Sequence, residues 1–299
     1  MTTKTVQTAL SDAILALFDS SSSPEIDAEV LLGHCLKQSR AWLLTYQDEE
    51  LTPEDIDRFD AYIQRRHQGE PIAYIVGTRE FWSLNLTVNE STLIPRPETE
   101  ILVEIALEKA ALFTTETFHD DPQQTQQSIH IVDLGTGSGA IALALATELP
   151  KAQITAVDMS AEALSIAQKN ADTHHLNHVK FLQSNWFSAL QDQQFDVICS
   201  NPPYIESQDP HLQQGDLRFE PNTALASGAD GFFDITHIIS HAKDYLNEGG
   251  WLILEHGFQQ AQRTQALLQE HGFANIDTRS DYAGHPRITF AQKQTIKDL

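Results

Sequence analysis

The chain has 299 residues, of which 41% are hydrophobic and 20% charged, and its formal net charge is −23 at pH 7. This length is sufficient for one large or two modest domains with a substantial core. Only 19 lysines and arginines stand against 42 acidic residues, so the chain is poorly suited to non-specific binding of nucleic-acid phosphates. A basic protein surface or a small cationic ligand is the easier partner.

Cysteine usage and hydropathy argue against a disulfide-rich, a metal-binding or a membrane-spanning protein. The two cysteines, Cys35 and Cys199, lie in apolar context and are expected to be buried thiols. Neither a disulfide framework nor metal-ligand spacing of the 13 histidines is evident. No uninterrupted apolar stretch is long enough to span a bilayer, and the N-terminus lacks a signal segment. We therefore expect a cytoplasmic monomer that binds no metal, no membrane and no nucleic acid directly.

Residues 1–72 are expected to form a helical bundle. Ser23-Pro24 and Thr52-Pro53 are typical of a helix N-cap followed by proline at the first helical position. After Pro53, apolar residues recur at helical spacing. Gly and Pro are otherwise scarce in this region.

Residues 73–97 are expected to form a β-hairpin linker. The stretches 74–82 and 84–88 are rich in β-branched and aromatic residues, and the second alternates apolar with polar residues. A helix is predicted at about 98–112. The polar stretch 114–127 is predicted to be a flexible insertion.

Residues 98–299 are expected to form one α/β domain, because from residue 128 strand and helix patterns alternate. The predicted fold is a Rossmann-like, seven-stranded sheet, mostly parallel with one antiparallel strand, since no helix separates the last two strands. Ligands bind such sheets at the carboxyl ends of the strands. Strands are predicted at 129–134, 153–158, 178–183, 195–200, 250–255, 274–279 and 286–291. Helices are predicted at 138–149, 160–171, 232–247 and 257–271.

A glycine loop follows the first of these strands. Gly135, Gly137 and Gly139 permit close approach of a ligand and unusual backbone angles. Asp158 ends the second strand, where a carboxylate can accept both hydroxyls of a ribose. The spacing is not that of dinucleotide enzymes, and Asp133, just before the loop, disfavours a pyrophosphate and suits an amino group. The loop predicts a nucleoside cofactor, with S-adenosylmethionine ahead of NAD; a tight turn without a ligand is the alternative.

Two other segments end strands at the same predicted edge. The Asn185-Trp186 pair offers an amide and an aromatic ring for an adenine, although a core aromatic is the alternative for the tryptophan. Asn201-Pro-Pro-Tyr204 follows the fourth strand. The Asn201 oxygen and the Pro202 carbonyl can each accept one N–H of a planar NH₂ group. The fixed φ of Pro202 and Pro203 makes the loop rigid, and Tyr204 offers an apolar face.

These motifs resemble those of class I S-adenosylmethionine-dependent methyltransferases that act on exocyclic or amide NH₂ groups. Further segments resemble the release factor glutamine methyltransferase family over nearly the whole chain. The segments that carry the resemblance are DLGTGSG (133–139), VDMS (157–160), NPPY (201–204), GTREFW (77–82), LIPRPETE (93–100), NWF (185–187), RFEP (218–221) and LEHG (254–257).

The resemblance implies N5-methylation of the glutamine in the Gly-Gly-Gln motif of peptide chain release factors, which would be the protein substrate. It implies that NPPY holds the glutamine amide, with Asn201, Pro202 and Tyr204 as the catalytic residues and Pro203 beside them. Arg96 is a candidate for shaping the substrate side; its alternative is a surface pair with Glu98 or Glu100. The implied S-adenosylmethionine contacts are Gly135, Thr136, Gly137, Ser138, Gly139, Asp158, Asn185, Trp186 and Asn201.

Three alternatives stay open at this point. A sister family methylates a glutamine of a ribosomal protein and shares NPPY, and the segment 96–100 favours release factors over it. A DNA adenine-N6 methyltransferase would use NPPY equally well, but it needs a basic recognition region. The third is a non-enzymatic cofactor-binding or docking module. The family often has an acidic residue at the position of Asn185, so this chain departs from the family pattern there, although an amide can still bond the adenine.

Overall fold

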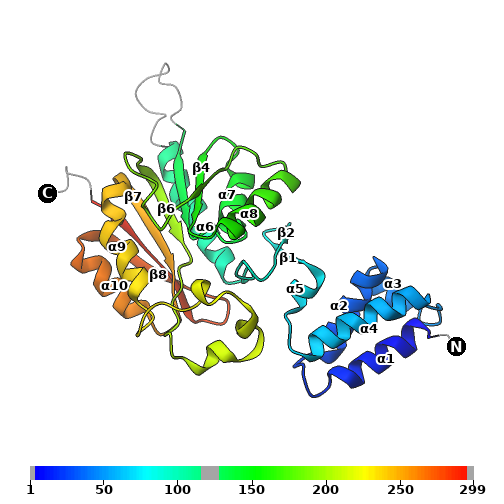
Figure 1. Ribbon diagram of the computed structural model, residues 1–299. Helices are drawn as coiled ribbons and strands as arrows, with labels where there is room; N and C mark the ends of the chain where they lie inside the picture. The colour runs from blue at the N-terminus through cyan, green and yellow to red at the C-terminus, as the bar shows by residue number, and fades with distance from the viewer. Residues whose placement is uncertain (1–3, 116–127, 295–299) are drawn as a thin grey trace. The chain divides into compact units, whose positions relative to one another are not determined.

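The computed structural model describes residues 4–115 and 128–294, which form two units (Figure 1). The smaller unit contains the chain up to Thr78 together with residues 214–219. The larger unit contains residues 79–213 and the chain from residue 220 onward.

The smaller unit is helical, as predicted for its sequence. Thr52 caps a helix with its hydroxyl, which accepts a hydrogen bond from the Asp55 N–H at 3.1 Å, and Pro24 and Pro53 are first helical residues. Leu31 and Phe59 are among the buried side chains that fill its core. Its helices are α1 (Val6–Leu17), α2 (Pro24–Leu36), α3 (Arg40–Thr45), α4 (Pro53–His67), α5 (Ile72–Val76) and the 3-10 helix η3 (Gly215–Phe219).

The start of the predicted hairpin was wrong. Residues 72–76 form α5, which begins after Pro71 and ends at Gly77 with φ +76°. Ile75 is buried in the core of the smaller unit, and this packing outweighs the strand propensity of the stretch. The hairpin itself consists of β1 (Thr78–Phe81) and β2 (Leu84–Thr87), joined by two residues of positive φ, Trp82 and Ser83.

The larger unit is built on a seven-stranded sheet with the order β5-β4-β3-β6-β7-β9-β8. The predicted mostly parallel sheet with one antiparallel strand is confirmed, because β9 pairs antiparallel with both of its neighbours. Strand order reverses beside β3, whose neighbours are β4 and β6. The strands are β3 (His130–Leu134), β4 (Gln153–Asp158), β5 (Lys180–Gln183), β6 (Phe195–Ser200), β7 (Leu246–Glu255), β8 (Phe273–Ser280) and β9 (Pro286–Lys293).

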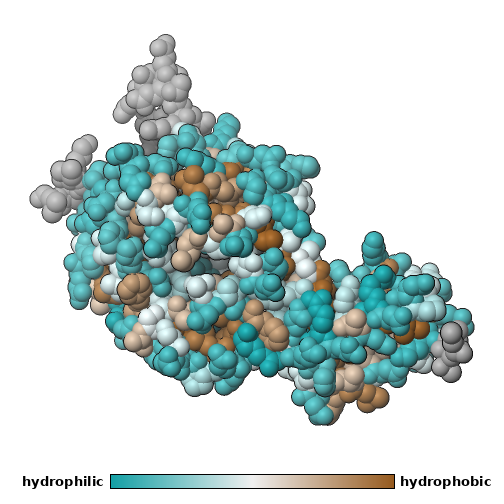
Figure 2. Space-filling view, viewed as in Figure 1, coloured by the Kyte–Doolittle hydropathy of each residue, from teal (hydrophilic) through white to brown (hydrophobic). Residues whose placement is uncertain are grey.

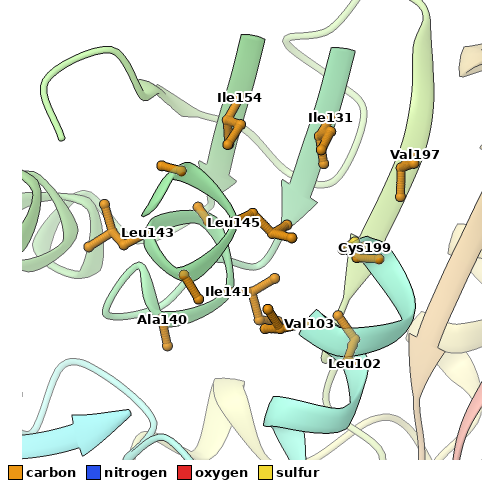
Figure 3. Close-up of a cluster of buried hydrophobic side chains, with 14 of the residues drawn as sticks. Leu102, Val103, Ile131, Ala140, Ile141, Leu143, Leu145, Ile154, Val197 and Cys199 are labelled. Atoms are coloured by element: carbon orange, nitrogen blue, oxygen red, sulfur yellow. The ribbon is translucent and has the colours of Figure 1, made fainter. Parts of the chain in front are cut away.

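Helices cover both faces of this sheet (Figure 1). Alternate strand residues point to opposite faces: Ile131 packs with residues of α6 and α7, whereas Val132 packs with residues of α9 and α10. Figure 3 shows the first of these two cores, with side chains of α6 and α7 against β3, β4 and β6. The helices are α6 (Thr99–Thr115), α7 (Ala140–Glu148), α8 (Ala161–Thr173), α9 (Phe233–Tyr245) and α10 (Ala261–Glu270), with short 3-10 helices η2 (Pro210–Gln213) and η4 (Asn222–Ala224).

Several element boundaries differ from the prediction by a few residues. The strand expected at 250–255 starts at Leu246, immediately after α9, because Leu246 is buried and pairs with Phe195. The helix expected to end near 112 continues to Thr115, and the rest of the expected insertion lies outside the described residues.

No helix in the described ranges could span a membrane. Figure 2 shows a face on which hydrophilic residues predominate.

Candidate active site

A cavity of about 360 Å³ lies at the carboxyl ends of β3, β4 and β6 in the larger unit, within the size range of ligand pockets, roughly 300–1,000 Å³. The glycine loop and the NPPY segment meet here because β3 and β6 are adjacent parallel strands. The predicted site residues that line the cavity are Gly135, Gly137, Asp158, Asn185, Trp186, Asn201 and Pro203. The others, which are not among its lining residues, are Arg96, Thr136, Ser138, Gly139, Pro202 and Tyr204.

The glycine loop adopts a backbone that other residues adopt only with strain. Gly135, Gly137 and Gly139 have φ values of +75°, +56° and +86°. The Gly135 N–H donates to the Val157 carbonyl at 2.8 Å, which ties the loop to β4. A Cβ at Gly135 would lie 3.4 Å from the Trp186 ring. Glycine therefore lets the loop approach this aromatic side chain and leaves the space beside it to the cavity.

The polar side chains of the loop serve as its scaffold. Thr136 and Ser138 are buried, and the Thr136 hydroxyl donates to Asp133 Oδ2 at 2.6 Å. The Ala142 N–H of α7 donates to the same oxygen at 3.2 Å. Burial raises the pKa of Asp133 to about 7, and its Oδ1 has no hydrogen-bond partner in the described part of the chain. Asp133 holds the loop against α7 and does not line the cavity.

Asp158 presents its carboxylate at the cavity wall. Its Oδ2 accepts the Gly137 N–H at 2.9 Å, and its Oδ1 accepts the Ser160 N–H at 2.9 Å. Burial raises the pKa of Asp158, and these backbone donors oppose the shift. Each carboxylate oxygen has a second acceptor site, so the group can still accept two ligand hydroxyls.

Trp186 forms an aromatic wall of the cavity. It has φ +51°, and its indole N–H donates to Asp234 Oδ1 at 3.2 Å. Asp234 also accepts the Ser227 hydroxyl at 2.7 Å, which orients the carboxylate. Asn185 is exposed and lines the cavity next to this ring.

Hydrogen bonds hold the first and the last residue of the NPPY segment. Asn201 Nδ2 donates to the Thr99 hydroxyl at 3.3 Å, and the Tyr204 carbonyl accepts the Gln260 amide N–H at 3.0 Å. Burial raises the pKa of the Tyr204 phenol, so it is protonated at neutral pH. Within residues 4–115 and 128–294, no hydrogen bond reaches the Asn201 Oδ1 or the carbonyl of Pro202. The sequence analysis predicted these two oxygens as acceptors for a planar NH₂ group.

Two residues behind Asn201 were not predicted as site residues. Thr99 is the first residue of α6, and Glu255 is the last residue of β7. The Thr99 hydroxyl donates to Glu255 Oε2 at 2.7 Å, and both side chains are buried. The sequence did contain a signal for Glu255. It is an acidic residue at the carboxyl end of β7, the strand next to β6, and the carboxyl ends of such strands are where ligands bind.

Arg96 forms an ion pair that the sequence did not predict. Its guanidinium donates to Glu220, whose side chain is fully buried. The Ile94 N–H donates to the other oxygen of that carboxylate at 3.0 Å. The surface pair with Glu98 or Glu100, considered as the alternative, is not the partner found. Glu220 therefore anchors the segment that precedes α6.

Comparison with known proteins identifies the family. The PrmC N-terminal domain model matches residues 8–77, and the methyltransferase small domain model matches residues 107–217. A release factor glutamine methyltransferase of Vibrio cholerae is 47% identical over 296 residues, which cover 98% of this chain and 99% of that protein. This chain belongs to the release factor glutamine methyltransferase family. Two further members of the family are each 47% identical. That of Aliivibrio fischeri matches over 275 residues (92% of each chain), and that of Escherichia coli over 283 residues (95% of this chain, 97% of the other).

The family predicted from the sequence is thus confirmed. In this member of the release factor glutamine methyltransferase family, the DLGTGSG, VDMS, NWF and NPPY segments each contribute residues to one cavity. The LIPRPETE and LEHG segments supply Thr99 and Glu255 behind it. Segments far apart in the chain therefore converge on Asn201.

Proposed function

We propose that this protein transfers the methyl group of S-adenosylmethionine to the side-chain amide nitrogen of the glutamine in the Gly-Gly-Gln motif of peptide chain release factors. The observation that carries the proposal is a single cavity lined by both Gly135 of the glycine loop and Asn201 of NPPY. A cofactor-binding module would need only the glycine loop. The acceptor oxygen at the same cavity supports transfer to an NH₂ group, and the names of the relatives support glutamine.

The cavity suits a nucleoside cofactor. Asp158 would accept the ribose hydroxyls, Trp186 would stack on the adenine and Asn185 would bond its edge. The space beside Gly135, which a side chain there would narrow, would take the rest of the molecule. S-adenosylmethionine supplies an electrophilic methyl group on a sulfonium sulfur when it is bound.

The NPPY residues would hold the glutamine amide. An amide nitrogen is a poor nucleophile because its lone pair is delocalised into the carbonyl. Asn201 Oδ1 and the Pro202 carbonyl would each accept one N–H, which orients the nitrogen and draws it toward a tetrahedral geometry. The fixed φ of Pro202 and Pro203 keeps the loop that carries the two acceptors rigid, and Tyr204 would support the planar group. Such positioning can contribute about 7–11 kcal/mol to lowering a barrier.

No side chain needs to remove the proton before the methyl group is transferred. The nitrogen becomes acidic once methylated, and its proton can then leave to water. Tyr204 is protonated at neutral pH because burial raises its pKa, so it is not a base. Catalysis by this chain would consist of orienting the amide and excluding competing geometries.

A methyl-transfer assay tests the proposal. The protein is incubated with labelled S-adenosylmethionine and release factor that carries either Gln or Ala in its Gly-Gly-Gln motif. We expect label on the Gln form only; equal labelling of both forms would refute the proposal. A ribosomal protein and duplex DNA serve as further substrates, and label on duplex DNA but not on release factor would favour adenine methylation.

Asn201→Ala separates catalysis from cofactor binding. It should lower kcat by about 100-fold or more while the cofactor Kd changes little. Asn247→Ala is the matched control, because Asn247 bonds Asp196 at 2.7 Å near the amino end of β7, away from the cavity. Unchanged turnover in Asn201→Ala would remove Asn201 from the catalytic role.

A further inference from the structure

A chain of hydrogen bonds runs from the buried Glu255 through the buried Thr99 to Asn201. Glu255 Oε2 accepts the Thr99 hydroxyl at 2.7 Å, and the Thr99 oxygen accepts Asn201 Nδ2 at 3.3 Å. Three elements meet here: the end of β7, the start of α6 and the loop after β6. Figure 3 shows Leu102 and Val103 of α6 beside Cys199 of β6, the packing that brings the first residue of α6 to Asn201.

The carboxylate at one end sets the direction of this chain. An ionised carboxylate can only accept hydrogen bonds, so Thr99 must give its single hydrogen to Glu255. The Thr99 oxygen is then only an acceptor, and the only group of the Asn201 side chain that can donate to it is the NH₂. The Asn201 carbonyl oxygen is thereby turned away from Thr99. The amide orientation thus follows from the chemistry of the three groups.

We propose that Thr99 and Glu255 are positioning residues that lock the Asn201 amide with its oxygen toward the substrate NH₂. The inference rests on the proposed function for the identity of that substrate. A flipped Asn201 would present its own NH₂ to the glutamine NH₂, and two donors cannot form a hydrogen bond. The lock therefore decides whether Asn201 can accept an N–H of the substrate.

The lock depends on the charge of Glu255. Burial raises the pKa of Glu255 to about 7. The hydrogen bond from Thr99 and the positive charges of Arg287 and Arg96 oppose this shift, whereas the negative charge of Glu98 adds to it. The charge of Glu255 also helps to raise the pKa of the Tyr204 phenol, which therefore stays neutral. When Glu255 takes up a proton, Thr99 no longer has to point its hydrogen at Glu255 and can give it to Asn201 instead. Both amide orientations then become available, and the fraction of productive enzyme falls.

Kinetics of Thr99 variants test the lock in the full-length protein. Thr99→Val removes the hydroxyl at constant shape and should lower kcat about tenfold, with the cofactor Kd changed less than about twofold. Thr99→Ser keeps the hydroxyl and should restore kcat. Thr155→Val makes the same chemical change at another buried threonine, within β4, and should leave kcat unchanged. A Thr99→Val enzyme with wild-type kcat overturns the proposal.

The pH profile provides a second test that holds even where Thr99→Val fails to fold. Wild-type kcat should fall as the pH drops through about 7. Gln at position 255 can either accept from or donate to Thr99. Glu255→Gln should therefore lower kcat about threefold at high pH and remove the dependence near pH 7. A Glu255→Gln profile that keeps the wild-type limb overturns the role of Glu255.

A spectroscopic measurement separates this inference from the proposed function. The side-chain NH₂ signals of Asn201 are assigned in ¹⁵N-labelled protein by their loss in Asn201→Ala. They should shift with pH in the wild type, and the shift should vanish in Glu255→Gln. This readout needs no methyl transfer, so failure of every substrate would refute the function and leave the lock standing. Signals that do not respond to pH would refute the lock.

Discussion

Replacing Asp133 with asparagine should make the protein more stable relative to wild type as the pH rises. Asp133 is fully buried beneath the glycine loop, and burial raises its pKa from 3.8 to about 7. Its Oδ2 holds Thr136 and the Ala142 N–H, and the asparagine oxygen can keep both bonds. The other oxygen has no partner in the described ranges, so the asparagine NH₂ would be placed there without an acceptor.

The sign follows from proton binding. The folded state holds the Asp133 proton more tightly than the unfolded state, so wild type loses stability as the pH rises from about 4 to about 7. The full shift in pKa corresponds to about 4 kcal/mol, of which about 2 kcal/mol falls between pH 5.5 and 8.5. The unpaired NH₂ costs about 1–3 kcal/mol at every pH. The variant should therefore be close to wild type at pH 5.5 and about 1–3 kcal/mol more stable at pH 8.5.

Urea unfolding at several pH values between these limits measures the effect. The difference in unfolding free energy between the two proteins should grow by about 2 kcal/mol across this range. Because desolvation causes the shift, added salt should leave this difference in place, whereas salt weakens effects of exposed charges. A difference that stays constant with pH, or that shrinks as the pH rises, would show that burial does not penalise the Asp133 charge.

Three further substitutions have defined outcomes. Gly139→Ala should lower the unfolding free energy, measured by urea unfolding, by about 1–3 kcal/mol. The φ of residue 139 is +86°, and a Cβ there would lie 3.1 to 3.3 Å from side chains of α7 and α8. Glu220→Ala should cost about 3 kcal/mol of stability in the same assay, since it leaves Arg96, 30% exposed, without its buried partner. Trp186→Phe should raise the cofactor Kd, measured by calorimetry, about fivefold, because the hydrogen bond to Asp234 that orients the ring is lost. An unchanged Kd would show that this hydrogen bond does not contribute to cofactor binding.

Much of the larger unit was predictable from local pattern. The strands at 153–158 and 195–200 were found at their observed bounds, because buried parallel strands are short apolar runs that end at turn residues. The glycine loop was recognisable because positive φ at Gly135, Gly137 and Gly139 requires a residue without a side chain. Residues 73–76 misled the prediction, because their helical conformation depends on burial of Ile75 against α2 and α4 in the smaller unit.

The order of residues along the chain was enough to indicate the family, the Rossmann-like sheet and the edge where the site lies. These properties depend on spacing within single segments and on the rule that parallel strands end at one edge. The hydrogen-bond partners were decided only by tertiary structure. Thr99 lies 102 residues from Asn201 along the chain, and Glu255 lies 156 residues from Thr99. Only the packing of α6 and β7 against β6 brings a hydroxyl and a buried carboxylate behind that amide. Which group donates and which accepts in a chain of hydrogen bonds is set only when all of its members are in contact.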